Sequence, residues 1–151
     1  MGGVPRRLAG FLELLEAVPD RADRIQLLID VADRFREVPP EIAERPFPES
    51  RRVPHCESEA FVWAVPRPDG TLDFHFAVEN PQGISARAMA VILDETLSGA
   101  PLEEVAWVPG DLPLEIFGNE LSMGKSMGLM GMVGMVLAAA RSRAGVAART
   151  G

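Results

Sequence analysis

The chain contains a single cysteine, Cys56, within the stretch RVPHCESEAFVW (residues 52–63). It lies where a loop enters a predicted hairpin, and functional residues gather on loops. Its close neighbours make the surroundings polar, unlike the interior of a core strand: His55, Glu57, Ser58 and Glu59. A free cysteine is also among the most buried residue types. The residues alone therefore leave two interpretations, a reactive thiol and a packed structural cysteine.

A nucleophilic thiol needs a base within hydrogen-bond reach. His75 lies on the face of a predicted strand away from its apolar residues. Together with Asp73 it is more typical of a solvated face than of a catalytic pair. His55 is adjacent to the cysteine, and its protonated form would favour the thiolate. A cysteine hydrolase that uses Cys56 with His55 or His75 is therefore one candidate function.

The residues needed for a metal site or a phosphate-binding loop are absent from the sequence. With one cysteine and two histidines, the chain has no Cys/His cluster at the spacing of a zinc site. Neither a GxxxxGK[ST] loop nor a GxGxxG that follows a strand is present. We therefore predict no metal site and no phosphate-binding loop.

Composition narrows the class of protein. The 151 residues favour a single domain over residues 1–151, and 47% hydrophobic with 25% charged residues is close to the average for a soluble protein. The net charge of −7 argues against nucleic acid, because phosphate binding needs a basic patch. One cysteine allows no internal disulfide, and the chain opens with no pattern of a secretory signal. We expect a cytoplasmic, reducing location.

Residues 126–140 carry no charge, but 15 residues fall short of the roughly 20 that a membrane-spanning helix needs. We interpret this stretch as a buried core helix and expect no membrane partner. Gly124 and Gly128 have the spacing of a small-xxx-small motif, which has its meaning in lipid. Five methionines along this helix could form an adaptable docking surface, but we expect them mainly to fill the core: Met123, Met127, Met130, Met132 and Met135.

Apolar periodicity predicts helices over residues 8–18, from the N-cap Asp20 to about Arg36, over 84–97, briefly after Pro101, and over about 122–143. Residues 38–48 contain four prolines and predict an ordered loop that wraps the body. Alternating strands around Asp69-Gly70 predict a hairpin with one buried face, formed by Phe61, Trp63, Val65, Leu72, Phe74 and Phe76. The expected fold is α+β, an antiparallel sheet built on this hairpin and covered on one face by helices, with a frayed tail over 145–151.

The stretch VPHCESEAF, followed by strand, Asp-Gly turn and strand, resembles the SufE family of sulfur-acceptor proteins. The family pattern is a valine, then Gly-Cys-x-Ser, with an aromatic residue five positions after the cysteine. Val53, Cys56, Ser58 and Phe61 fit that spacing.

Three further segments resemble the family in the same order: DRIQLLIDVADRFREVPPEI, SGAPLEEV and LSMGKSMGL. The likeness covers about residues 20–143. Two positions depart from the family pattern: His55 replaces the usual glycine, and Lys125 replaces the usual arginine at the start of the last helix.

The resemblance implies a SufE/IscU-like fold and a sulfur carrier that activates a cysteine desulfurase. Cys56 would accept persulfide sulfur and pass it to an iron–sulfur scaffold protein. The desulfurase would carry pyridoxal phosphate, so this chain would need no cofactor, and it would act as a monomer or weak homodimer. His55, Glu57 and Ser58 would shape the surroundings of the thiol, and Lys125 would contact the partner. The competing classes are the thiol hydrolase and a non-catalytic interaction domain with an inert cysteine.

Overall fold

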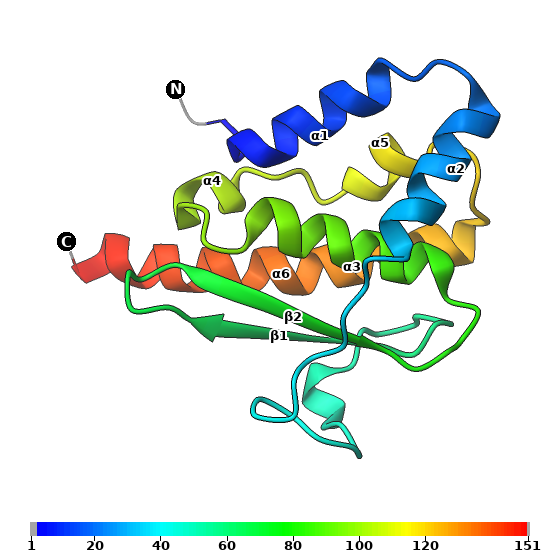
Figure 1. Ribbon diagram of the computed structural model, residues 1–151. Coiled ribbons are helices and arrows are strands. Elements are labelled where there is room, and N and C mark those ends of the chain that lie inside the picture. Colours follow the sequence, from blue (N-terminus) through cyan, green and yellow to red (C-terminus); the bar gives the residue numbers. More distant parts are fainter. Residues whose placement is uncertain (1–2, 151) are drawn as a thin grey trace.

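The computed structural model describes the backbone of residues 3–150 and the side chains of residues 3–145. In this range, helices pack against one face of a two-stranded antiparallel sheet (Figure 1). The predicted α+β class is confirmed. The elements in chain order are α1 (Arg6–Glu16), α2 (Arg21–Ala32), the 3-10 turn η1 (Glu49–Arg51), β1 (Ala60–Pro66), β2 (Leu72–Val78), α3 (Ile84–Leu97), α4 (Leu102–Ala106), α5 (Leu112–Phe117) and α6 (Met123–Thr150).

Local signals explain most of these boundaries. Asp20 is the N-cap of α2 as predicted, since its carboxylate accepts a hydrogen bond of 3.0 Å from the Asp23 N–H. The helix ends earlier than the predicted Arg36, because the chain must be extended by Val38, whose N–H bonds to the Phe76 C=O at 2.8 Å. A pairing partner in the sheet therefore overrides the continuing apolar periodicity.

Two other helices differ from the sequence expectation. Helix α5 lies outside the helices that apolar periodicity predicts, and its Pro113 falls in the first helical turn, where a missing N–H does no harm. The backbone of α6 stays helical to Thr150, beyond the predicted end at Arg143. The expected fraying of 145–151 concerns a segment whose side chains after Gly145, and whose last residue, lie outside the described residues.

The predicted hairpin is present, and its turn is closed by local hydrogen bonds. Gly70 has φ +89°, a left-handed conformation that glycine adopts without steric penalty. The Asp69 carboxylate accepts bonds from the Thr71 hydroxyl at 2.6 Å and from the Thr71 N–H at 2.9 Å. These bonds favour the charged form and hold the pKa of the Asp69 carboxyl below its usual value.

The expected single buried face of the hairpin is wrong, because both faces are covered. Paired residues of an antiparallel ladder lie on the same face, and the register pairs Val62 with Phe76 but Trp63 with His75. Val62, Phe74 and Phe76 therefore face the helices, whereas Trp63 and its neighbour Phe61 face the other way. The two apolar sets that alternation suggested do not share a face.

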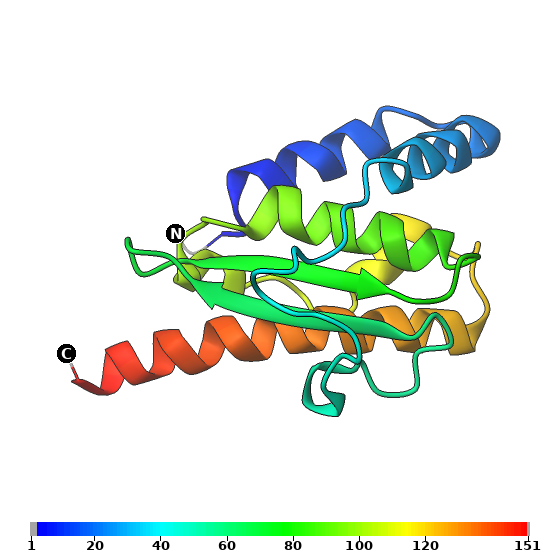
Figure 2. The same ribbon diagram turned by 60° about the horizontal axis from the view of Figure 1, so that its bottom comes forward.

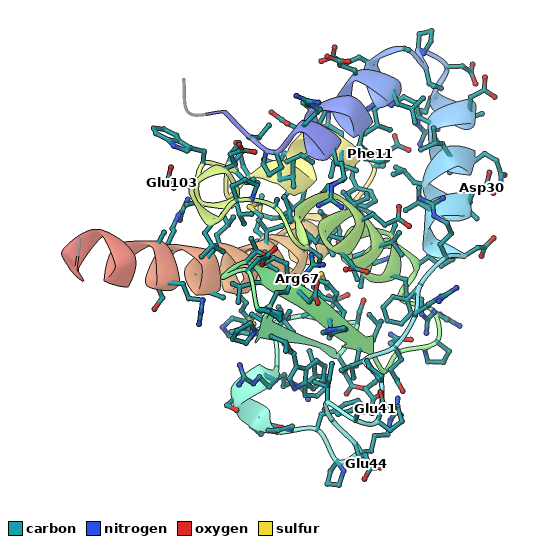
Figure 3. The ribbon with its side chains drawn as sticks, turned by 60° about the vertical axis from the view of Figure 1, so that its left-hand side comes forward. Phe11, Asp30, Glu41, Glu44, Arg67 and Glu103 are labelled. Carbon is teal, nitrogen blue, oxygen red and sulfur yellow. The ribbon has the colours of Figure 1, made fainter. Side chains whose placement is uncertain are left out.

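The proline-rich segment, residues 38–48, forms the second cover. Phe47 packs on Phe61 and Trp63, with ring centroids 5.2 and 5.1 Å apart, and makes a small second core with them. Figure 2 shows this segment crossing the side of the sheet opposite α3 and α6, and Figure 3 shows Glu41 and Glu44 at its outer end. Arg45 fixes the proline-rich segment through ion pairs with Glu37 and Glu79.

The apolar helix α6 is the long core helix that the sequence predicts. By length and composition alone, Met123–Gly145 would also pass as a membrane span. One face of the helix is nevertheless built into the main core, where these residues are at most 2% exposed: Leu129, Met132, Val133, Val136, Leu137 and Ala140. Burial in the protein accounts for its apolar character.

Candidate functional site

Cys56 lies in a closed loop, residues 53–59, which we call the cysteine loop. At its base the Val53 N–H donates to the Ala60 C=O at 2.8 Å, and inside it the Glu59 N–H donates to the Cys56 C=O at 3.1 Å. The Asn80 N–H also donates to the Ser58 C=O at 3.1 Å. The hairpin therefore holds both ends of the loop at fixed places.

The thiol itself faces inward. Cys56 is only 9% exposed and, with Val53, belongs to the main core. It rests on the first part of α6, where a Cβ added to Gly128 would lie 3.2 Å from the Cys56 Cα and 3.4 Å from its Sγ. In this arrangement the missing side chain of Gly128 leaves the space that Cys56 occupies.

Gly128 is one of three glycines on the same face of α6, which we call the glycine face: Gly124, Gly128 and Gly131. A Cβ on Gly131 would lie 3.1 Å from the Val53 Cγ1, and one on Gly124 would lie 3.4 Å from the Glu57 Oε1. The spacing i, i+4, i+7 brings all three under the cysteine loop.

Sequence reasoning missed this role of the glycines, although a signal was present. Glycine inside a helix is less favourable than alanine by roughly 0.5–1 kcal/mol, so glycines repeated at helical spacing indicate that a backbone must come close. The small-xxx-small spacing of Gly124 and Gly128 has that meaning here, with a loop in place of a second membrane helix.

Ser58 is seated in a similar way at the start of α3. A Cβ on Gly83 would lie 3.1 Å from both the Cβ and the Oγ of Ser58. Gly83 immediately precedes α3 and is itself buried. The cysteine loop is therefore held between the beginnings of α3 and α6.

His55 occupies a left-handed backbone conformation, with φ +57°. Such a conformation is unfavourable for residues with a Cβ by roughly 1–2 kcal/mol, and glycine escapes this penalty. The geometry thus explains why a glycine precedes the cysteine in the pattern of the resembling family. The His55 side chain is exposed, and no hydrogen bond joins it to Cys56 in the described part of the chain.

Two charged side chains predicted for the site lie at the edge of the cysteine loop. Glu57 is exposed and faces Gly124. Lys125 is exposed in the first turn of α6, where its backbone N–H donates to the Ser122 Oγ at 3.2 Å. Within the described residues, no acidic group lies within ion-pair distance of the Lys125 ammonium. Both charges are therefore available to solvent beside the cysteine loop.

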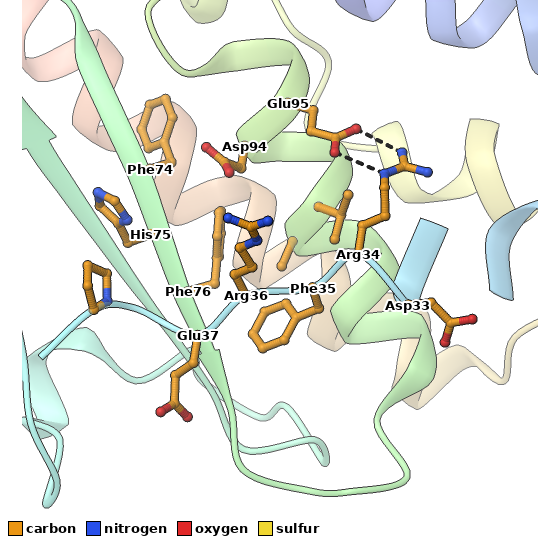
Figure 4. Close-up of a pocket in the computed structure, with 13 residues that line it drawn as sticks. Asp33, Arg34, Phe35, Arg36, Glu37, Phe74, His75, Phe76, Asp94 and Glu95 are labelled. Atoms are coloured by element: carbon orange, nitrogen blue, oxygen red, sulfur yellow. Dashed lines mark hydrogen bonds and ion pairs between the residues drawn. The ribbon is translucent and has the colours of Figure 1, made fainter. Parts of the chain in front are cut away.

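His75 belongs to a different place. It lines an open cleft of about 710 Å³ between the end of α2, β2 and α3 (Figure 4). Arg34 and Glu95 form a bidentate pair across this cleft at 3.0 and 2.8 Å. Cys56 is not among the residues that line it. His75 pairs with Trp63 within the ladder, roughly 10 Å along β1 from Ala60 at 3.4 Å per residue.

The structure therefore brings together Cys56, Glu57, Ser58 and the start of α6 with Lys125, and leaves His75 apart. Among the described residues no side chain makes a hydrogen bond to the Cys56 Sγ, and no three His, Cys, Asp or Glu side chains are grouped as a metal site. What the site offers is one sheltered thiol in a loop with a polar, exposed outer side.

Comparison with known proteins assigns the chain to a family. The sequence model of the SufE family, described as an Fe-S metabolism associated domain, matches residues 9–140. The chain belongs to the SufE family. The matched residues include the whole cysteine loop and the glycine face, and the suspected resemblance is confirmed.

A solved structure shares the SufE fold seen here. A hypothetical protein from Thermus thermophilus, determined in solution, superposes with a TM-score of 0.70 at 26% sequence identity. The likeness covers 93% of this chain and 97% of that chain. No curated protein matches the sequence. Membership in the family associates the chain with iron–sulfur metabolism.

The contact between Cys56 and Gly128 predicts opposite effects for two similar substitutions. Gly134→Ala, at a glycine with open space around it, is expected to stabilise the protein by about 0.5–1 kcal/mol through better helix propensity. Gly128→Ala is expected to lack this gain and to speed alkylation of Cys56 several-fold, because the added methyl group displaces the loop. Urea unfolding and iodoacetamide labelling measure both effects. Equal stabilisation by both substitutions with unchanged labelling would contradict the packing.

The left-handed conformation of His55 predicts that His55→Gly is more stable than His55→Ala. The relief of roughly 1–2 kcal/mol of backbone strain exceeds the chain entropy of glycine, for a net difference on the order of 0.5–1 kcal/mol. Urea unfolding of both variants measures the difference.

Glu57 provides the control for His55, since its φ is not positive. There the order is expected to reverse, with Glu57→Ala more stable than Glu57→Gly. The same order at both positions would show that His55 is not strained.

Proposed function

We propose that this protein accepts sulfur as a persulfide on Cys56 from a cysteine desulfurase and passes it to an iron–sulfur scaffold protein. The observation that carries the proposal is the place of the only cysteine. It lies in a loop that packs against Gly83 at the start of α3 and against the glycine face of α6. The family of the chain is associated with iron–sulfur metabolism.

The reaction is a thiol–persulfide exchange. The Cys56 thiolate attacks the terminal sulfur of the persulfide on the desulfurase, and a new S–S bond forms to Cys56. The S–S bond in the donor breaks, and the desulfurase cysteine leaves as its thiolate. The two thiolates exchange roles, so no outside oxidant or reductant is needed.

A single thiol suits a carrier. With no second cysteine in the chain, the persulfide on Cys56 cannot be resolved as an internal disulfide. One thiol is also too few to hold an iron–sulfur cluster, which takes several ligands. The chain would therefore deliver sulfur rather than assemble the cluster, and the pyridoxal phosphate would belong to the desulfurase.

The burial of Cys56 implies a movement. Cys56 is 9% exposed and its Sγ lies against α6 at Gly128, so we infer that exchange with a persulfide on another protein requires the loop to open. The outer residues of the loop are exposed and polar, and the Cys56–Glu59 turn is closed by one backbone bond of 3.1 Å. We infer that Cys56 is sheltered in the free protein, where a persulfide would otherwise be lost to other thiols, and becomes exposed on docking.

The competing function, a cysteine hydrolase, would need a histidine as general base beside the Cys56 thiol. His75 lines the cleft beyond the sheet, and His55 turns outward without a hydrogen bond to the thiol in the described chain. A hydrolase would need one of them beside the Sγ. The carrier needs no such base, because the exchange requires only thiolate and access, in the reducing cytoplasm that we propose as its location.

The proposal predicts a change in intact mass. After incubation with a cysteine desulfurase, pyridoxal phosphate and cysteine, the protein is expected to gain one sulfur atom that dithiothreitol removes. Cys56→Ser, confirmed to be folded, is expected to gain none. Wild-type protein that binds a desulfurase but stays at its original mass would contradict the sulfur transfer.

The inferred movement predicts faster labelling of Cys56 in the complex. The desulfurase for this test has its own catalytic cysteine replaced by serine, so that only Cys56 reacts at the interface. Iodoacetamide is expected to label Cys56 at least several-fold faster in the complex than in the free protein, with the urea-unfolded chain as the upper limit. Similar rates in the free and bound protein would contradict the opening of the loop.

A further inference from the structure

Large apolar side chains are exposed at seven positions of the described chain: Leu14, Ile29, Ile84, Trp107, Leu114, Met123 and Met127. Three of these, Ile84, Met123 and Met127, belong to the two helix beginnings that hold the cysteine loop. We call these three residues the docking rim. Exposed apolar groups that gather in one place indicate an interaction surface, whereas single ones are ordinary.

The two methionines lie beside the glycine face. Met123 and Met127 each precede a glycine whose Cα approaches the loop, Gly124 at Glu57 and Gly128 at Cys56. Since they are four residues apart, both side chains lie on one face of α6. They are 80% and 58% exposed, while Met132 further along the helix is fully buried. The expectation that the methionines fill the core is therefore correct for Met132 and wrong for Met123 and Met127.

Ile84 flanks the loop at its contact with Gly83. It follows Gly83, which contacts Ser58, and its side chain is 50% exposed at the start of α3. Figures 1 and 2 both place the beginnings of α3 and α6 at the same end of the molecule. The rim thus borders the cysteine loop at two helices that are far apart in sequence.

We propose that Ile84, Met123 and Met127 anchor the cysteine desulfurase during sulfur transfer, a proposal that rests on the function proposed above. The Cys56 Sγ must come within bonding distance of a sulfur atom on the donor, so the donor must cover the loop and its border. Burial of the rim then supplies binding energy that is independent of the reacting atoms. Methionine is suited to this role because its flexible thioether adapts to a partner while the loop moves.

The chemistry of transfer selects the desulfurase rather than a second copy of this chain. A second copy would bring another sheltered thiol and no sulfur to donate. A dimer formed through the rim would also cover the loop and close it to the donor. Lys125 is exposed two residues from each methionine, so it lies on the opposite side of the glycine face from Met123 and Met127. A donor that covers the loop from both sides would meet this positive charge, which suits a carboxylate on the partner.

The experiment replaces the rim without touching the thiol. Met123→Gln/Met127→Gln and Ile84→Gln keep the side-chain size but remove apolar area. Leu14→Gln and Trp107→Gln are matched controls, because these side chains are 51% and 65% exposed and lie outside the rim. Circular dichroism and urea unfolding establish that all variants are folded.

Each variant is titrated with pyridoxal-phosphate-loaded cysteine desulfurase, and both the Kd and the persulfide gained on Cys56 are measured. The rim variants are expected to raise the Kd, and the half-saturating concentration for transfer, by about tenfold. The maximal transfer rate should stay unchanged, because the reacting atoms are intact. The controls are expected to match the wild type.

Each other outcome has a definite meaning. Rim variants that bind as tightly as the wild type overturn the rim and leave the sulfur transfer standing. Wild-type protein that binds but gains no sulfur overturns the transfer, while the Kd values still decide the rim. Loss of self-association in the rim variants, with unchanged desulfurase binding, would assign the surface to a second copy and overturn the proposal. Absence of any binding by the wild type overturns both.

Discussion

The backbone of α6 approaches the cysteine loop so closely that a methyl group on Gly128 would press against Cys56. Three glycines in succession along one helix face make this approach, and each of them is unfavourable for the helix itself. The glycines thus lower the stability of the helix itself, but they allow Cys56 to pack against it with only 9% of the residue exposed. The sheltered state of Cys56 follows from this contact, and Lys125 and the docking rim lie at the helix beginnings that hold the loop.

The hairpin supplies the other half of the constraint. Its first strand is buried on both faces, by the helices on one side and by the proline-rich segment on the other. A strand fixed on both sides cannot slip in register, because a slip of one residue would exchange its two faces. Since the loop ends at Ala60, where β1 begins, this fixed register also fixes where Cys56 meets α6. The proline-rich segment therefore contributes to the site through the register of β1.

Two features of the site favour different states of the loop. Burial of Cys56 and Val53 in the core favours the closed loop. The left-handed backbone of His55 and Glu59, at φ +57° and +52°, disfavours it. A loop under such opposing tendencies can open at a modest cost when a partner compensates for the lost burial. His55, in place of the family's usual glycine, adds backbone strain to the closed loop and so lowers the free energy needed to open it.

The sequence by itself determined the elements whose signals are local. Asp20 capped its helix, Asp69-Gly70 turned the hairpin, and the spacing around Cys56 indicated the family, because each of these depends on a few neighbouring residues. Tertiary structure alone decided the rest. It placed Phe61 and Trp63 on the face away from the helices, since register is a property of two strands. It separated His75 from Cys56 and turned three helix glycines into the seat of the thiol, since these contacts join residues distant in the chain.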